Sequence, residues 1–193
     1  MRKPTWRKTT AWPLFWLYAV LIVYASLYPF ENWRFQGLLS WSFLTAPWPR
    51  YWTGFDVFSN VLGYAPLGFL LALAVQRSRL HWPAVTLAAL VAAGLSLAME
   101  SLQMFLPVRV PSNLDWVLNV GGAWAGAVVA RGLAWAGLLE RWGRFRDRWF
   151  EPEASGPLAL LALWPLALLF PAPVPFGLGH VFERVETTWI EGL

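Results

Sequence analysis

The sequence contains no cysteine and only two histidines, His81 and His180, among its 193 residues. Without thiols the chain has no disulfide framework, no thiolate nucleophile and no cysteine metal site. Two histidines are also too few for the usual zinc centres, which take three or four protein ligands. We therefore expect neither a metal ion nor another cofactor.

Charged residues are scarce, at 13% of the chain, whereas soluble domains typically carry about 25%. A soluble fold of this size would expose a large part of its surface to water, and these residues are too few to cover it. The hydrophobic fraction of 58% excludes a disordered chain as well. The net charge is +4, but the basic residues are scattered between apolar runs, so we do not expect nucleic-acid binding.

Long uncharged runs predict an all-α, polytopic membrane helix bundle with about five transmembrane helices. A bilayer core about 30 Å thick is crossed by roughly 20 helical residues. The first run is too long for a signal peptide and no cleavage site follows it, so we expect it to be retained. The last run is short enough to be re-entrant instead. The five runs are Thr9–Phe30, Val57–Gln76, Leu80–Met99, Trp116–Ala130 and Gly156–Phe170.

Basic residues are distributed unevenly over the connecting segments. If the N-terminus is cytoplasmic, eleven of the fifteen Lys and Arg residues lie inside and four lie outside, as the positive-inside rule requires. This predicts a multi-pass protein of the cell (cytoplasmic) membrane in three parts. Residues 1–137 form a four-span core with an aromatic outer loop at 29–54, residues 138–155 form a basic cytoplasmic interfacial segment, and residues 156–193 hold a fifth span and an outer tail. The aromatic loop is expected at headgroup level, either as an anchor or as a surface that admits lipid-like molecules.

Polar residues interrupt the second, third and fourth runs near their outer ends. Separations of three or four residues place the two members of each pair on one helix face. The pairs are Asp56 with Asn60, Glu100 with Gln103, and Asp115 with Asn119. Charged groups near hydrocarbon are costly and usually face a bundle interior, a partner or water, and the planar guanidinium of Arg109 can satisfy one or two carboxylates. These residues form the predicted ligand-binding site: Asp56, Asn60, Glu100, Gln103, Arg109, Ser112, Asp115 and Asn119.

Two structural roles compete with a binding site. The same residues could form a polar clamp that holds the helices together. Asp56 and Asp115 could also be first-turn residues that are favoured by the helix dipole. Other features predict close packing within the bundle: Gly122 and Gly126 form a GxxxG motif, and Pro66 should bend the second span.

These motifs resemble the VanZ-like family of membrane proteins over roughly residues 10 to 137. The run ESLQMFLPVRVPSNLDWVLNVGGAWAG, from Glu100 to Gly126, has the family spacing E-x-x-Q-x-F-x-P-x-R-x-x-S-x-x-D-x-x-x-N-x-x-G-x-x-x-G. The run DVFSNVLGYAPLGF resembles the family's D-x-x-x-N and P-x-G, with Tyr64 where phenylalanine is more usual. The family is named for a protein linked to resistance to teicoplanin, a lipid-bearing glycopeptide that acts at the outer leaflet.

The residues and the resemblance together predict a protein that binds an amphiphilic or lipid-linked cell-envelope molecule at the outer leaflet. Its expected partners are membrane lipids and a lipid-linked envelope precursor or a lipoglycopeptide, with teicoplanin-type resistance as a consequence. One alternative is an intramembrane enzyme whose paired carboxylates, drawn from Glu100, Asp115 and Asp56, act on a lipid headgroup. Another is a non-catalytic membrane scaffold. The sequence assigns no catalytic residue and leaves the oligomeric state open.

Overall fold

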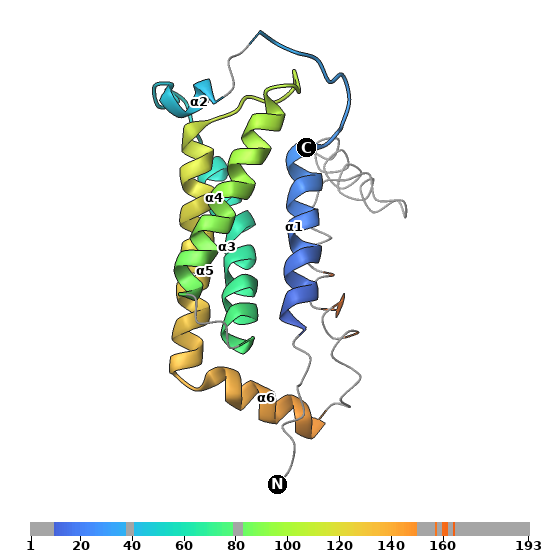
Figure 1. The fold of residues 1–193 in the computed structure, drawn as a ribbon, viewed down its shortest axis with the longest axis vertical. Coiled ribbons are helices and arrows are strands. Elements are labelled where there is room, and N and C mark those ends of the chain that lie inside the picture. Colours follow the sequence, from blue (N-terminus) through green and yellow to red (C-terminus); the bar gives the residue numbers. More distant parts are fainter. Residues whose placement is uncertain are drawn as a thin grey trace, which may run out of the picture. The chain divides into compact units, whose positions relative to one another are not determined.

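The computed structural model describes residues 10–37, 41–78 and 83–149 and, beyond these, only residues 157, 160, 161 and 164. Contacts divide the chain into two units, Met1–Trp149 and Phe150–Leu193. The predictions for residues 1–9, for the fifth span at 156–170 and for the outer tail fall mainly or wholly outside the described residues. Within the first unit the described elements are helices (Figure 1): α1 (Ala11–Leu27), α2 (Ser42–Thr45), α3 (Gly54–Arg77), α4 (Ala84–Gln103), α5 (Asn113–Trp135) and α6 (Leu138–Trp149).

Three of these helices, α3, α4 and α5, are long and apolar enough to cross a membrane, and α1 is a shorter apolar helix of 17 residues. The predicted all-α membrane bundle is therefore confirmed: three expected spans are helices of spanning length, and the first corresponds to the shorter apolar helix α1. Several boundaries differ from the expected runs: α5 extends at both ends, to Asn113 and Trp135, and α4 begins at Ala84, directly after Pro83, and continues through Glu100 to Gln103. The expected span ended at the first charged residue, but the helix continues because that carboxylate lies inside the protein.

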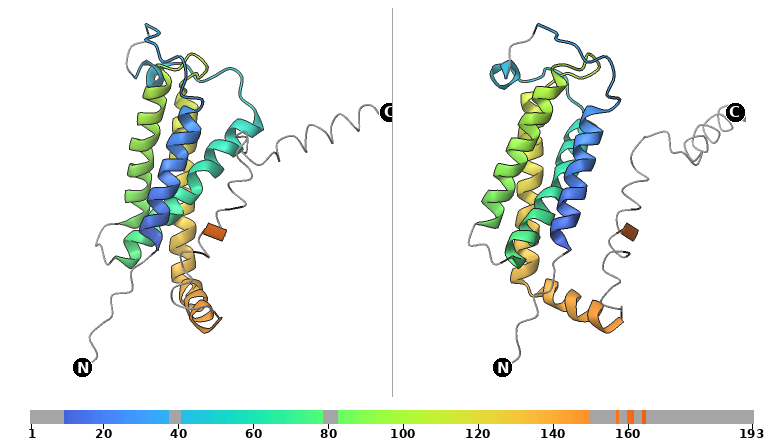
Figure 2. Two further views of the ribbon diagram at one scale, coloured as in Figure 1. Left: turned by 90° about the vertical axis from the view of Figure 1, so that its right-hand side faces the viewer. Right: turned by 45° about the vertical axis from the view of Figure 1, so that its right-hand side comes forward.

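The closest packing in the bundle joins α3 to α5, which run in the same direction (Figures 1 and 2). A Cβ atom added to Gly122 would overlap the backbone of Val61, and one added to Gly126 would overlap the backbone of Ala65. The predicted close approach at the GxxxG motif is therefore confirmed. Gly68 makes the reciprocal contact from α3, because its Cβ would overlap the backbone of Ala123.

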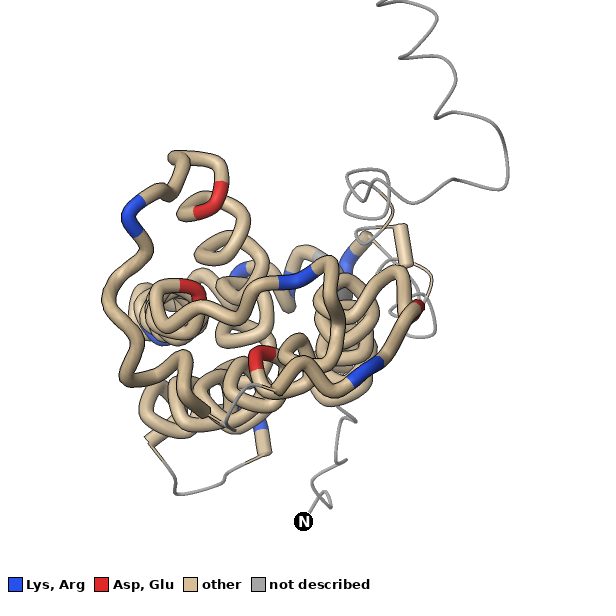
Figure 3. The backbone as a smooth tube through the Cα atoms, turned by 90° about the horizontal axis from the view of Figure 1, so that it is seen from above, with Lys and Arg blue, Asp and Glu red and all other residues tan. Residues whose placement is uncertain are grey.

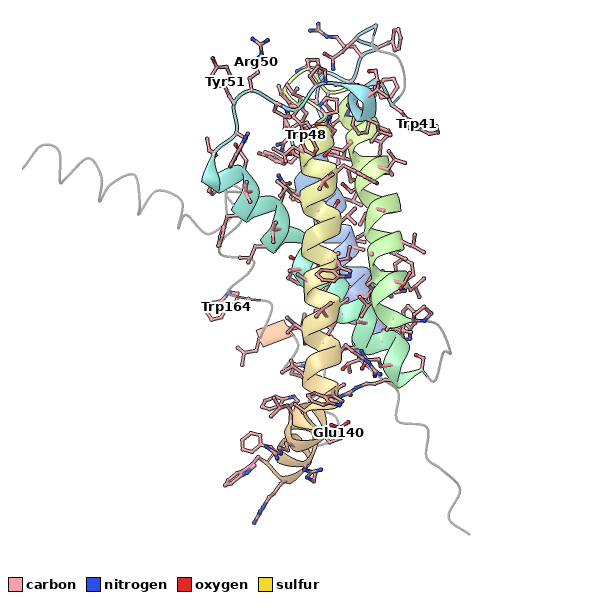
Figure 4. All side chains as sticks on the ribbon, turned by 90° about the vertical axis from the view of Figure 1, so that its left-hand side faces the viewer. Trp41, Trp48, Arg50, Tyr51, Glu140 and Trp164 are labelled. Carbon is pink, nitrogen blue, oxygen red and sulfur yellow. The ribbon has the colours of Figure 1, made fainter. Side chains whose placement is uncertain are left out.

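Helix α3 leans away from the bundle toward its N-terminal end, as Figure 2 (left) and Figure 4 show. Pro66 lies inside this helix, where it removes one backbone hydrogen bond and its ring crowds the preceding turn. Neighbouring helices commonly satisfy carbonyls that such a proline loosens. The hydroxyl of Tyr18 in α1 donates to the carbonyl oxygen of Gly63 at 3.0 Å, one turn before the proline.

Helix α6 differs from the other long helices because it is rich in both arginine and aromatic residues. It follows α5 after a turn at Gly137, whose φ of 67° is in the left-handed region. The rings of Trp142 and Phe145 stack with centroids 5.6 Å apart, and Trp149 continues the row at 6.2 Å. The expected basic segment at 138–155 is thus helical over 138–149, and its membrane location remains a prediction.

Candidate functional site

All eight predicted site residues lie toward one end of the bundle, within about two helical turns of where α1 and α4 end and α3 and α5 begin. We call this the polar end. Figure 3 views the molecule along its long axis from this side, with acidic positions in red and basic positions in blue. Among the described residues, no group of three or more His, Cys, Asp or Glu side chains is placed to hold a metal ion.

Glu100 connects the end of α4 to the start of α5. Only 3% of its surface is exposed, and its Oε2 atom accepts a hydrogen bond of 2.8 Å from the backbone N–H of Ser112. Ser112 is the N-cap of α5, and its hydroxyl oxygen accepts from the N–H groups of Leu114 and Asp115 at 3.2 and 3.4 Å. The Glu100 carboxylate therefore lies at the positive end of the α5 dipole, which partly offsets the cost of its burial.

Gln103 and Arg109 bind the C-terminal end of α1. The last carbonyl groups of a helix have no partner within the helix, and α1 has no basic residue in its last turn. Gln103 Nε2 donates to the Ser26 carbonyl at 2.9 Å. One guanidinium nitrogen of Arg109 donates to the carbonyls of Ala25 and Tyr28, at 3.3 and 3.0 Å. These two side chains supply the donors and the positive charge that the end of α1 lacks.

The pairing of Arg109 with carboxylates, which the sequence suggested, is not formed among the described residues. Its hydrogen bonds go to α1 instead. The reason is the position of α1, whose C-terminal end lies beside the α4–α5 connection. There the guanidinium binds carbonyl groups that have no partner within α1.

Asp56 and Asn60 make local hydrogen bonds within the first turns of α3. Asp56 and the N-cap residue Thr53 form a capping box, in which the Asp56 carboxylate accepts from the Thr53 N–H at 2.8 Å. Asn60 Nδ2 donates to the Asp56 carbonyl at 2.9 Å. The helix-start role that the sequence offered as an alternative therefore accounts for the contacts of Asp56.

Asp115, in the first turn of α5, is partly buried. It lies near enough to both Glu100 and Asp56 for electrostatic repulsion between their charged forms. Among the described residues, no side-chain donor or cation is bonded to its carboxylate. The polar end therefore brings three carboxylates into electrostatic contact, while the nearby Arg109 is engaged elsewhere.

A buried polar cluster lies one to two turns deeper, between α3, α4 and α5. Asn119 Nδ2 donates to Ser96 Oγ at 2.9 Å, and its Oδ1 atom is buried without a hydrogen-bond partner. The Tyr64 hydroxyl lies beside Ser96 and Glu100 but makes no hydrogen bond of acceptable geometry. Tyr64 and Asn119 are each only 5% exposed. Unpaired buried polar atoms are rare and call for an explanation, such as water or a ligand.

Two members of this cluster, Tyr64 and Ser96, are absent from the predicted site. The helical period could have found them. Tyr64 follows Asn60 by four residues and Ser96 precedes Glu100 by four, so each extends a predicted polar face by one turn. The sequence marks Tyr64 only as a departure from the family's phenylalanine, although its hydroxyl is what places it in the cluster.

The aromatic loop is attached to the polar end by three hydrogen bonds. The N–H of Arg34 donates to Phe105 O at 2.9 Å, and Gln36 Nε2 donates to Met104 O at 2.8 Å. Asn113 Nδ2, in α5, donates to the loop carbonyl of Ala46 at 2.7 Å. Figure 4 shows Trp41 and Tyr51 of this loop projecting away from the helices at this end. Large apolar side chains of the loop are exposed, among them Trp41, Trp48, Tyr51 and Trp52.

A sequence model of the family described as VanZ/LLP1 matches residues 15–136, from the first turns of α1 to the end of α5. This agrees with the resemblance seen in the motifs, which extended over roughly residues 10 to 137. Neither a curated protein nor a solved structure matches the chain.

Proposed function

Because the chain belongs to the VanZ/LLP1 family, we propose that this multi-pass membrane protein binds an amphiphilic or lipid-linked molecule of the cell envelope. The polar end receives the headgroup, and the apolar helices contact the chain or chains. Teicoplanin-type resistance is one consequence of such binding, because a protein that holds the antibiotic or its lipid-linked target would reduce their encounter.

The observation that carries this proposal is the burial of Glu100 among apolar helices. A carboxylate at this depth is costly, and such groups usually serve a pathway, a ligand or a partner. The single hydrogen bond from Ser112 does not use all the acceptor sites of a carboxylate. The unpaired polar atoms of Tyr64 and Asn119 lie just below it, so a polar group that enters from the membrane surface would find partners there.

We place the polar end at the outer leaflet. Support comes from the arginines of α6, which follows α5 at the opposite end of the first unit: Arg141, Arg144 and Arg148. Basic residues favour the cytoplasmic side. Anionic lipids of that leaflet attract arginines that flank an apolar face, and the row formed by Trp142, Phe145 and Trp149 provides such a face.

Direct binding tests the proposal. Purified protein in phosphatidylcholine nanodiscs is titrated with a fluorescent polyprenyl-diphosphate-linked envelope precursor and, separately, with fluorescent teicoplanin. We expect saturable binding of at least one probe. The Glu100→Gln variant should bind the probe roughly tenfold more weakly, because it loses one charged hydrogen-bonding group. It keeps an acceptor for the N–H of Ser112.

Glu140→Gln is the matched control, because Glu140 is an exposed glutamate on α6, away from the polar end. It should bind as the wild type does. The proposal fails if neither probe binds saturably, or if Glu100→Gln binds both probes as well as Glu140→Gln. If the protein chemically converts a probe, and this conversion is lost in Glu100→Gln, the result would instead support the intramembrane-enzyme function.

A further inference from the structure

The free hydrogen-bonding capacity at the polar end consists mainly of acceptors. The Glu100 carboxylate has one donor, from Ser112, and Asp115 has no side-chain donor among the described residues. The unpaired atom of Asn119 is its carbonyl oxygen, Oδ1. The Tyr64 hydroxyl can accept as well as donate. A ligand group that matches this set must therefore bring several N–H or O–H donors.

The local charge is negative as well. Glu100 and Asp115 repel each other, and Asp115 is also repelled by Asp56. The nearest basic side chain in sequence, Arg109, points its donors at the carbonyl groups of α1. A cation between the carboxylates would relieve this repulsion, whereas a phosphate would increase it.

From this arrangement we infer that the polar end binds the primary ammonium group of an amphiphile, between Glu100 and Asp115 and above Tyr64 and Asn119. This deepens the proposed function and rests on it, because the site is the same. A primary ammonium carries one positive charge and three N–H donors. Charge-assisted hydrogen bonds of this kind are about twice as strong as neutral ones, and water excluded from the site increases their strength further.

The choice of a primary ammonium follows from the donors. A quaternary ammonium has the charge but no N–H group, so it would leave Asn119 Oδ1 unpaired. Quaternary groups are instead bound by aromatic cages, and the three deeper side chains here, Tyr64, Ser96 and Asn119, offer a single ring. A phosphate or sugar acid would need a cationic partner, but the guanidinium of Arg109 is already bonded to carbonyl groups at the end of α1.

Competition between lipids that differ in one headgroup tests the inference. The protein, in mixed micelles, is offered equal amounts of phosphatidylethanolamine, N-acetyl-phosphatidylethanolamine, phosphatidylcholine and phosphatidylglycerol with distinguishable acyl masses. Retained lipids are then counted by native mass spectrometry. N-acetylation removes the charge and two donors but keeps the phosphate. We expect phosphatidylethanolamine to be enriched roughly tenfold over its N-acetyl form, as for one charged hydrogen-bonded contact.

Three variants assign the enrichment to the site. Glu100→Gln should reduce it to about threefold or less, since a neutral acceptor remains. Tyr64→Phe, which removes one oxygen without changing the ring, should reduce it by about twofold to fivefold. Glu140→Gln should leave it unchanged. Each variant must elute as the wild type does on size exclusion, so that a folding defect is not read as lost binding.

Two outcomes would overturn the inference without touching the proposed function. One is equal retention of the amine and its N-acetyl form while the precursor or teicoplanin still binds through Glu100. The other is Glu100-dependent enrichment of phosphatidylglycerol. If no lipid and no probe is retained in any arm, the inference and the proposed function fail together. Equal retention of all four lipids would mean that water alone fills the cluster, and this result would also overturn the inference.

Discussion

The α3–α5 crossing and the polar end hold the bundle together by different means. At the crossing, glycines let two backbones touch, and no side-chain hydrogen bond is required. At the polar end, side chains of α4 and of the α4–α5 connection bind backbone groups at the end of α1 and at the N-cap of α5. The crossing fixes the distance between the helices, because a glycine contact admits no added atom. The polar end fixes their ends, where unpaired backbone groups would be most costly in a membrane.

This difference predicts how each region tolerates change. At the crossing, even a glycine-to-alanine substitution should force the two backbones apart. At the polar end, a single substitution removes only the hydrogen bonds of that side chain. The residues whose backbones meet at the crossing are glycines, alanines and a valine, which carry no polar side chain. The polar end contains more acceptors than its own contacts satisfy, so the candidate site and the scaffold overlap there but not at the crossing.

Gly126→Ala should have the largest effect on stability. The added Cβ would overlap the backbone of Ala65, so α3 and α5 must move apart, at a cost of about 3 kcal/mol, the upper part of the usual range for overpacking. The measurement is the midpoint of thermal unfolding in detergent, followed by size exclusion.

Gly121→Ala is its matched control on the same helix. A Cβ at Gly121 would meet nothing within 4 Å, and this residue is exposed. Alanine is favoured over glycine inside a helix by about 0.5–1 kcal/mol, so this variant should be slightly more stable than the wild type. Equal destabilisation by both variants would contradict a glycine-dependent crossing.

Glu100→Ala should have the second-largest effect. It leaves the N–H of Ser112 without its acceptor in a buried position, which costs about 1–3 kcal/mol. Glu100→Gln keeps an acceptor oxygen and should lose less, while Glu140→Ala should change nothing. The three unfolding midpoints, measured side by side, decide whether the bond or the charge stabilises the polar end. A glutamine variant as unstable as the alanine variant would show that it is the charge.

Arg109→Ala should have a smaller, local effect. The carbonyls of Ala25 and Tyr28 lose their donor, so the last turn of α1 should open more often while the rest of the bundle remains intact. Hydrogen exchange followed by mass spectrometry should show faster exchange near residues 25–30. Arg34→Ala removes an exposed arginine side chain at the same end, and it should not change exchange in α1. Unchanged exchange in the Arg109 variant would show that the cap is dispensable.

The crossing was more accessible to prediction from the sequence than the polar end. Glycines four residues apart lie on one helix face, so Gly122 and Gly126 indicated close packing without knowledge of the partner. The partners at the polar end depend on which helix end lies nearby, and that is a property of the packed bundle. Nothing in the spacing of Arg109 points to carbonyls more than 80 positions earlier in the chain.

The sequence does not predict the two deeper members of the candidate site, Tyr64 and Ser96, and the reason is different. The expected spans are uncharged runs that end at charged residues, and an uncharged polar residue such as serine or tyrosine does not interrupt such a run. Ser96 lies between Leu95 and Leu97 and reads as part of an apolar run, but its hydroxyl binds Asn119. Extending each polar face by one helical turn would have included both Ser96 and Tyr64.

The smallest expected effect belongs to Asp56→Asn, which separates the two roles of this residue. Asparagine can still accept the hydrogen bond from the N–H of Thr53, so α3 should begin as before and stability should not change. The charge that repels Asp115 is removed, however. If the polar end binds an ammonium group, less negative potential should lower the enrichment of phosphatidylethanolamine slightly, by roughly twofold or less at this exposed position. A loss as large as that in Glu100→Gln would mean that Asp56 contacts the ligand directly, and the first turn of α3 would then belong to the site as well as to the scaffold.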